Sequence, residues 1–414
     1  MGKVDYRAPD IRIIQEETIW KEILLEDNVS FFGGLTYHPK DIRNGEGTLV
    51  LRSSNIFDGE IVNADDVYVD DSIVNVDNVK EGDIIVVVRN GSKALLGKHG
   101  IIKKESPKTV IGAFMTGVRC DSPDFYNALL SSPQFHKEIR KNLGATINQI
   151  TNGNFKKMKF YIPSDKEERN SIGIFFRTLD DSIAFTSKEL AKLKDIKKTF
   201  RYMLFPASGK TKPQLRFNGF SGDWSSAPLS DYLTIRNDIC GSNYTINDVL
   251  SVSGDYGVVN QIAFQGRSFA GASIANYRVA NVGNVIYTKS PLKANPYGII
   301  KAVKKDEGVV SPLYAVYNTT EKADANFIQV FFDEVVSLNN YLRPLVNKGA
   351  KNTLLISDET AISGSVTFPD VEEQRAIANF FVAVDALIDA NNRRLEKLRH
   401  LKAACLDGMF VNEK

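Results

Sequence analysis

Several residues in this chain have the types that nucleases and phosphoryl-transfer enzymes use, and their spacing decides whether they can act together. Asp165 and the segment Asp195-Ile-Lys197 have the composition of a nuclease acid and lysine set. One continuous helix is expected there and would place these groups about 45 Å apart, too far to share a metal ion. Gly209-Lys210-Thr211 matches the end of a phosphate-binding loop, but the first glycine of that motif would fall at Leu204 and a helix precedes it. Neither set predicts catalysis.

Methyl transfer and metal binding lack the required spacing as well. Asn295-Pro296-Tyr297 resembles the catalytic loop of amino-methyltransferases without its second proline, and Gly45-Glu-Gly47 stands alone in an expected turn. The four histidines and three cysteines show no ligand spacing: His38, His99, His136, His400, Cys120, Cys240 and Cys405. We therefore expect no catalytic centre in this chain, and no metal ion or cofactor bound by it.

The composition is typical of a reduced, cytoplasmic protein with more than one domain. The chain has 414 residues, of which 43% are hydrophobic and 25% charged, with a net charge of +2. It contains no apolar run long enough to span a membrane, and the first ten residues are polar where a signal peptide would be apolar. Association with a membrane is not expected.

Charge is unevenly distributed along the first part of the chain. Residues 1–90 carry 9 Lys and Arg against 18 Asp and Glu, whereas residues 91–160 carry 12 against 4. Such polarisation is typical of a near-neutral body with one basic face that attracts phosphates. Chance clustering of surface charge remains the alternative.

An internal repeat of about 205 residues runs through nearly the whole chain. Phe160 to Arg169 matches Val366 to Arg375 at an offset of 206, and the helical residues that follow match at 205. The only two tryptophans, Trp20 and Trp224, lie 204 apart. Self-similarity at one fixed period indicates a duplicated architecture.

Each repeat begins with a segment that we expect to be mixed and mostly β. Short apolar or β-branched runs predict strands at Val50-Leu51, Asp83 to Val88, Val285 to Tyr287 and Leu313 to Val316. Short helices are expected at Pro123 to Asn142 and Ala323 to Leu342, and Lys210 to Trp224 is interpreted as a linker.

Each repeat ends in a long helix with one apolar stripe. Ser164 or Asp165 is expected to cap the first helix and Asp370 the second. The stripe positions alternate in steps of three and four, as in a coiled-coil seam. In the first helix they are Phe176, Leu179, Ile183, Thr186, Leu190, Leu193, Lys197, Phe200 and Leu204. In the second they are Phe381, Val384, Ile388, Asn391, Leu395, Leu398, Lys402, Cys405 and Met409, with polar residues on the same rungs.

Two such helices in one chain most simply pair with each other. We predict an α+β protein in which two mostly-β domains alternate with two helices that form an intramolecular antiparallel coiled coil, with approximate two-fold symmetry. Two helices packed separately on their own domains, or a parallel homodimeric zipper, remain open. The predicted segments are 1–160 and 209–366 for the globular domains, and 161–208 and 367–414 for the helical regions.

Side chains able to read DNA bases or bind phosphates occur in the predicted loops of both domains. Arg and Lys suit guanine, Asn and Gln suit adenine, and short polar groups and cations suit phosphates. In the first domain the candidates are Thr36, Tyr37, Ser53, Asn55, Arg89, Asn90, Ser92, Lys93, Lys98, His99, Asn148 and Gln149. In the second they are Tyr256, Asn260, Gln261, Gln265, Arg267, Tyr277, Lys289, Ser290, Tyr297, Lys348, Lys351 and Asn352. A solvated loop side chain is the alternative for each.

The duplicated helical motif resembles that of the specificity subunits of type I restriction–modification enzymes. Pro163 to Arg169 and Pro369 to Arg375 each carry a Glu-Glu pair ahead of the arginine, followed by Phe-Phe and a long Lys-Leu-rich helix. Asp83 to Ser92 looks like the family's strand and basic loop, and Gly144 to Gln149 looks like its return loop. The second copy departs there, since Gly349-Ala-Lys-Asn352 keeps only the outline.

This resemblance implies a subunit that is not an enzyme and that reads a bipartite double-stranded DNA target. One half would be read by each target recognition domain, and the length of the coiled coil would set the number of unread base pairs. Two methyltransferase subunits would dock on it and methylate adenine with S-adenosylmethionine. Restriction and translocation subunits, which use ATP and Mg²⁺, would join them.

Two other classes of function remain to be discriminated. An enzyme that fuses methylation to recognition would carry its methyltransferase motifs ahead of the recognition domains, and Trp20 already lies within the first one. A scaffold on a coiled coil, either an orphan DNA-binding protein or one that does not bind DNA, is the second alternative. The salt dependence of DNA binding separates a DNA-binding protein from one that does not bind DNA.

Overall fold

The computed structural model describes residues 9–12, 18–143, 148–271, 273–292, 294–349 and 354–411. Contacts divide the chain into two compact units. Unit 1 comprises the residues up to Glu189 together with those from Asn391 onward, and unit 2 comprises Leu190–Ala390. Both divisions fall inside long helices, so each unit contains part of each helix. The four-segment division of the sequence stays a prediction.

Unit 1 is built on two β-sheets. The larger has the order β2 (Ser30–Gly33), β11 (Met115–Arg119), β8 (Ile84–Val87), β9 (His99–Ile101), β6 (Glu60–Ile61) and β5 (Ile56–Phe57). The smaller has the order β10 (Thr109–Ile111), β4 (Thr48–Leu51), β7 (Val67–Val69) and β3 (Ile42–Arg43). The two strands predicted for this segment are confirmed as β4 and β8. All four residues of β8 are buried, as expected for an apolar strand paired on both sides.

The helix predicted over Pro123 to Asn142 is two helices, α1 (Pro123–Leu129) and α2 (Pro133–Asn142). Ser132 has an extended backbone, with φ −78° and ψ 161°. The residue before a proline disfavours the helical conformation, so the chain breaks there and Pro133 begins a new helix. A third helix, α3 (Asn152–Lys156), follows.

Unit 2 contains a four-stranded sheet and several ribbons. The sheet has the order β14 (Leu233–Ile235), β21 (Tyr314–Thr319), β18 (Val285–Thr288) and β19 (Ile300–Ala302), and it confirms the two strands predicted here. The ribbons pair β15 (Leu250–Ser253) with β16 (Gly257–Asn260), β17 (Arg278–Ala280) with β20 (Gly308–Val310), and β22 (Asn347–Lys348) with β23 (Leu354–Leu355). Its short helices are α5 (Gln261–Gln265), α6 (Ala325–Phe332), α7 (Val335–Leu342) and α8 (Asp358–Ala361).

The helix predicted over Ala323 to Leu342 is likewise interrupted, here without a proline. α6 ends before Asp333, whose carboxylate binds Lys301, and the side chain of Glu334 accepts a hydrogen bond from the Ser337 amide to begin α7. The ion pair of Asp333 and the capping bond of Glu334 therefore separate the segment into two helices.

The repeat is visible in one ribbon of each unit. β1 (Trp20–Leu24) pairs antiparallel with β12 (Lys159–Pro163), and β13 (Ser225–Pro228) pairs antiparallel with β24 (Ser365–Phe368). Trp20 lies opposite Pro163, and Trp224 directly precedes the Ser225–Phe368 pair. Both tryptophan side chains are 2% exposed, so the sequence repeat corresponds to the same local packing.

Each repeat ends in a helix of 39 residues, α4 (Lys166–Leu204) and α9 (Val371–Met409). Asp165 caps α4, because its carboxylate accepts hydrogen bonds from the Glu167 and Glu168 amides at 3.2 and 3.0 Å. α9 begins directly after Asp370. None of the helices in the described part of the chain has the length and apolarity to cross a membrane.

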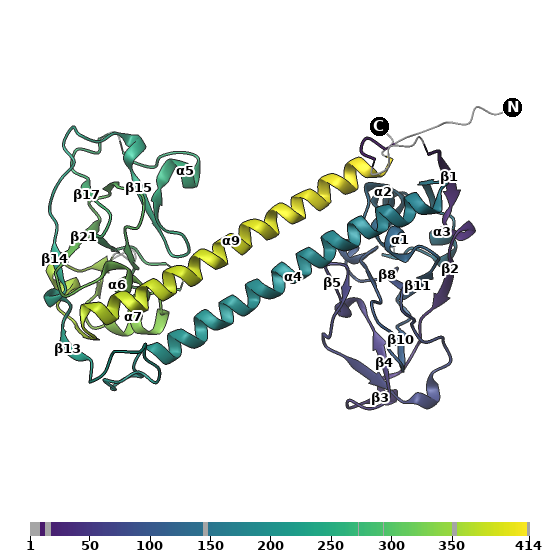
Figure 1. Ribbon diagram of the computed structural model, residues 1–414, viewed down its shortest axis with the longest axis horizontal. Helices are drawn as coiled ribbons and strands as arrows, with labels where there is room; N and C mark the ends of the chain where they lie inside the picture. The colour runs from purple at the N-terminus through teal and green to yellow at the C-terminus, as the bar shows by residue number, and fades with distance from the viewer. Residues whose placement is uncertain are drawn as a thin grey trace. The chain divides into compact units, whose positions relative to one another are not determined.

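The two helices pack antiparallel (Figure 1). In unit 1 the Phe176 ring on α4 lies 5.8 Å from Phe410, just beyond the end of α9. In unit 2 the Phe200 ring near the end of α4 lies 4.8 Å from Phe380 near the start of α9. Every predicted seam position is buried or half-buried. The predicted α+β fold with an intramolecular antiparallel helix pair is therefore confirmed.

Candidate nucleic-acid interface

Five of the predicted DNA-reading residues of unit 1 line one open groove of about 650 Å³. β2, β11 and β8 are antiparallel neighbours, so the ends of β2 and β8 and the start of β11 meet at one edge of the sheet. The loops at that edge, together with the 3-10 helix Ser53–Asn55, form the groove. Its predicted readers are Thr36, Tyr37, Ser53, Arg89 and Asn90.

The loop that follows β8 is held by contacts from distant parts of the chain. The Asn90 side-chain amide donates to the Ser53 hydroxyl at 3.2 Å, and the Asn148 side-chain amide donates to the Gly91 carbonyl at 2.9 Å. Arg89 and Gln149 form an isolated antiparallel bridge. Asn148 and Gln149 therefore lie beside the groove, and the loop is fixed in position, as base readout requires.

Cationic and small polar side chains surround this loop. Arg89, Ser92 and Lys93 are exposed, and the Lys98 ammonium donates to the Ser53 carbonyl at 3.0 Å. No described carboxylate forms an ion pair with Arg89 or Lys93. These side chains are therefore available to anionic phosphates and to base edges.

Two candidates of unit 1 are structural, and their assignment as DNA readers is corrected. Asn55 is fully buried, and its side-chain amide donates to the Asp66 carboxylate at 2.7 Å and to the Val62 and Ala64 carbonyls. His99 lies with Nδ1 2.8 Å from the Gly97 carbonyl and Nε2 3.0 Å from the Ser131 hydroxyl. Burial lowers the pKa of His99 to about 4, although the neighbouring carbonyls oppose this, so the imidazole is neutral at pH 7 and cannot bind phosphate as a cation.

In unit 2 the exposed candidates cluster on the β15–β16 hairpin and the α5 segment. We call Tyr256, Phe264, Gln265, Arg267 and Phe269 the hairpin–helix patch. Tyr256 is 69% exposed and its ring lies 5.2 Å from that of Phe264. Gln265 and Arg267 are exposed as well. The patch therefore offers aromatic, amide and guanidinium groups together.

Asn260 and Gln261, also predicted as readers, instead hold this patch in place. The Asn260 side chain caps α5 by accepting from the Ala263 amide at 3.0 Å. The Gln261 side chain donates to the Ser251 hydroxyl at 3.1 Å and accepts from the Phe269 amide at 2.7 Å. Their polar groups are satisfied within the protein, so they are positioning residues.

The remaining candidates of unit 2 are less accessible or not described. Lys289 forms an ion pair with Asp358, which also binds Arg278, and only 19% of the Lys289 side chain is exposed. Lys289 is thus an internal ion-pair partner, and its assignment to DNA is corrected. Tyr277, Ser290 and Tyr297 are half-buried. Outside the described residues lie the Lys348 side chain, Lys351, Asn352 and the first four residues, Gly144 to Ile147, of the predicted return loop Gly144 to Gln149.

Sequence reasoning missed three exposed phenylalanines among these groups. Phe114 lines the groove of unit 1 and is 54% exposed, and in the patch of unit 2 Phe264 is 42% and Phe269 is 59% exposed. An isolated phenylalanine in sequence is ordinarily interpreted as a core residue. Arg52 also lines the groove, and its guanidinium binds the Asp65 carboxylate at 2.8 Å.

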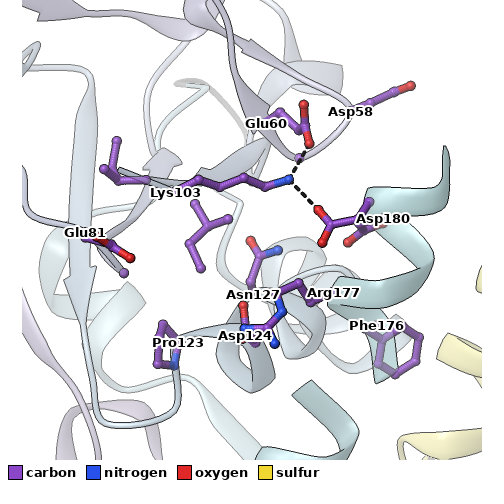
Figure 2. Close-up of a pocket in the computed structure, with 15 residues that line it drawn as sticks. Asp58, Glu60, Glu81, Lys103, Pro123, Asp124, Asn127, Phe176, Arg177 and Asp180 are labelled. Carbon is purple, nitrogen blue, oxygen red and sulfur yellow. Dashed lines mark hydrogen bonds and ion pairs between the residues drawn. The ribbon is translucent and has the colours of Figure 1, made fainter. Parts of the chain in front are cut away.

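A second hollow of unit 1, about 550 Å³, lies where α1 and α4 meet the sheet (Figure 2). Lys103 donates to Glu60 at 2.6 Å and to Asp181 at 2.8 Å, and Arg177 binds Asp124 at 2.8 Å. Its six carboxylates outnumber its two cations and would repel phosphates. They are Asp58, Glu60, Glu81, Asp124, Asp180 and Asp181. The ion pairs in this hollow hold the globular part of unit 1 against α4. The hollow is separate from the candidate interface.

Comparison with known proteins finds similarity to one domain family and to several solved structures. Residues 20–195 match the family described as "Type I restriction modification DNA specificity domain". The fold is similar to that of the type I restriction–modification S subunit from M. genitalium, at 12% identity over 98% of this chain and 100% of that chain, with a TM-score of 0.65. Residues 20–195 thus have the sequence of a type I restriction–modification DNA specificity domain, and the chain has the fold of an S subunit. Among curated proteins no sequence matches this one significantly.

Two further solved structures are similar to this chain at lower scores. The HsdS subunit from Thermoanaerobacter tengcongensis has 14% identity over 94% of this chain and 96% of that chain, with a TM-score of 0.38. A chain from a study of complex assembly and conformational transition of the type I R-M system has 14% identity, covers 95% and 97%, and has a TM-score of 0.42.

The family model that matches residues 20–195 describes a DNA specificity domain. The residues that resemble catalytic sets have structural roles here. Asn295 lies in a turn in which its carbonyl accepts from the Leu292 and Gly298 amides. Asp165 caps α4, and Lys197 is paired with Asp385. In the part of the chain that the structure describes, no three His, Cys, Asp or Glu side chains gather to hold a metal ion.

Proposed function

We propose that this chain is a type I restriction–modification specificity subunit and that it reads a two-part double-stranded DNA target, one half with the groove of unit 1 and the other with the hairpin–helix patch of unit 2. The observation that carries the proposal is that each unit presents an exposed arginine beside amide and aromatic side chains on loops fixed by hydrogen bonds. Arginine can bind O6 and N7 of guanine in the major groove, and Asn or Gln can bind N6 and N7 of adenine.

The groove of unit 1 contains both kinds of group that sequence-specific binding needs. Arg89 and Asn90 are suited to base edges, and Lys93 and Ser92 on the same loop are suited to the flanking phosphates. Phosphate contacts would position the protein without sequence preference, and the base contacts would select the site. Substitution of the two classes should therefore have different effects.

We propose further that the chain acts in the cytoplasm with two adenine methyltransferase subunits and with restriction subunits. These partners would supply S-adenosylmethionine, ATP and Mg²⁺ chemistry, which this chain would direct to its target. The match of residues 20–195 to a type I restriction modification DNA specificity domain supports this division of labour. The duplicated helix and ribbon architecture supports two equivalent partner sites.

The test is to co-express the chain with type I methyltransferase subunits from the same organism and to sequence the methylated adenines. We expect one bipartite motif. Asn90→Ala should relax or change one half of that motif and Gln265→Ala the other half. Lys188→Ala, at an exposed position on α4, is the control and should leave the motif unchanged. A motif that changes in neither half, or methylation by the chain alone, would contradict the proposal.

A further inference from the structure

The two units share an exposed arginine stacked on an exposed phenylalanine. The Arg89 guanidinium lies 4.9 Å from the centre of the Phe114 ring in unit 1, and the Arg267 guanidinium lies 4.6 Å from the centre of the Phe269 ring in unit 2. Both rings are more than half exposed. A cation over an aromatic face is attracted to it, which orients the guanidinium.

These pairs differ from a third arginine–phenylalanine pair in unit 1. Arg119 also lies 4.9 Å from a ring centre, that of Phe32, but its guanidinium binds the buried carboxylate of Asp83 at 2.7 Å. Arg119 is therefore committed to the interior. No described carboxylate pairs with Arg89 or Arg267, so their hydrogen-bond donors remain available.

Each pair is fixed by the backbone around it. The Phe114 carbonyl accepts hydrogen bonds from the Val88 and Arg89 amides at 3.1 and 3.2 Å, which joins the two residues directly. In unit 2, Gly266 caps the C-terminus of α5 with φ 74°, and the Phe269 amide donates to the Gln261 side chain at 2.7 Å. Both rings are therefore already positioned before DNA binds. This favours a role in contacting the surface of a base over a role in which the ring inserts between base pairs.

We propose that each arginine–phenylalanine pair reads a two-base step, in which the arginine binds guanine and the phenylalanine contacts the 5-methyl group of a neighbouring thymine. The inference rests on the proposed function and names its specificity-determining residues. A guanidinium that binds guanine O6 and N7 lies in the plane of that base. A ring stacked on it then lies near the level of the next base pair, since consecutive bases rise by about 3.4 Å.

The thymine methyl is the apolar group that the major groove presents at that level. Apolar side chains recognise thymine through it, and adenine, guanine and cytosine offer no equivalent. An exposed phenylalanine in a polar groove has apolar area that such a methyl would cover. A wedge between base pairs is the competing role, and it would not depend on the methyl group.

The experiment replaces thymine by uracil, which differs from it only in lacking the 5-methyl group. The full chain selects duplexes from a random library at low salt, and the enriched duplexes are resynthesised with 2′-deoxyuridine at each thymine in turn. In the unmodified chain, one substitution in each half-target should lower affinity about fourfold, the value expected for one buried methyl group. Phe114→Ala should abolish this difference in one half and Phe269→Ala in the other.

Three further variants serve as a conservative substitution, a control and a test of the arginine. Phe114→Leu retains an apolar side chain and should keep part of the thymine preference. Phe57→Ala replaces a phenylalanine of unit 1 that is 63% exposed and does not line the groove, and it should leave the preference unchanged. Arg89→Lys should weaken discrimination at the neighbouring guanine, because lysine cannot form the planar bidentate contact.

The outcomes separate this inference from the proposed function. If a sequence is enriched but uracil binds as well as thymine, or if the thymine preference survives in Phe114→Ala and Phe269→Ala, the inference is overturned and sequence reading stands. If no sequence is enriched by the chain, with or without methyltransferase subunits, the proposed function itself is contradicted.

Discussion

Lys402 on α9 forms an ion pair with Asp180 on α4, with 2.5 Å between ammonium and carboxylate, and only 20% of each side chain is exposed. The same pair occurs in unit 2, where Lys197 on α4 binds Asp385 on α9 at 2.5 Å. Each lysine occupies a polar rung of the predicted seam. Burial raises the pKa of Asp180, and Lys402 opposes that rise. The same Asp–Lys ion pair thus joins the two helices at equivalent seam positions of both repeats, although apolar side chains alone could form such a seam.

Removing one partner of this rung should destabilise unit 1. Lys402→Met leaves the half-buried Asp180 carboxylate without its cation, and we expect a loss of about 2 kcal/mol, between the values for exposed and buried pairs. The double variant Asp180→Leu with Lys402→Met should recover most of the loss, because no charge is then left in the seam. Urea unfolding followed by circular dichroism measures both, with Lys188→Met on the exposed face of α4 as control. A double variant as unstable as the single one would show that the rung has another role.

The helices and the repeat could be predicted because their signals are local and periodic. Steps of three and four identify a seam whatever the distant sequence is, and α4 and α9 begin and end within a few residues of the predictions. Two segments were each predicted as one helix and are interrupted. The break before Pro133 has a local cause, the proline itself, whereas the break at Asp333 depends on a distant contact. Asp333 binds Lys301, 32 residues earlier, and no local pattern indicates that pairing.

His99 should make the stability of unit 1 depend on pH. Its pKa lies at about 4 in the folded chain, against an ordinary value of 6.5. The unfolded chain therefore binds more protons between these values, so the stabilisation is complete above pH 6.5 and is lost as the pH falls toward 4. The loss amounts to about 3 kcal/mol at most. Urea midpoints between pH 7 and 4 for the wild type and His99→Gln measure it. The variant should show a shallower decline, and parallel curves would exclude His99 as the source.

Asp358 should be a main electrostatic determinant of stability in unit 2. Burial opposes its ionisation, but hydrogen bonds from Lys289 and Arg278 outweigh burial and lower its pKa. Asp358→Asn leaves two cations that are each about one-fifth exposed without a carboxylate, and we expect a loss of about 3 kcal/mol. Asp238→Asn is the matched control, since Asp238 is 69% exposed in its pair with Arg236 and its loss should be under about 1 kcal/mol. Equal effects on thermal unfolding would contradict the argument.

The site was predicted less completely than the fold because exposure depends on distant contacts. Asn55 and Lys289 have the chemistry of DNA readers, but Asp66 and Asp358 occupy their polar groups. Phe114 has the chemistry of a core residue, yet it is exposed because the turn at Gly112 directs it into the groove. The DNA-reading loops therefore stay a prediction, and residue type alone could not tell which of their side chains already have partners within the protein.

Lys93 should contribute to affinity without contributing to specificity. It is exposed on the 3-10 helix Lys93–Leu95, next to the loop that carries Arg89 and Asn90, and should bind a phosphate. Lys93→Ala should weaken binding to all sequences equally and reduce the slope of log affinity against log salt by about one. Fluorescence anisotropy with selected and random duplexes at several salt concentrations measures both quantities. Lys108→Ala removes a lysine that is paired with Asp71 outside the groove and should leave the slope unchanged. A Lys93→Ala variant that loses affinity only for the selected duplex would instead place this side chain against a base.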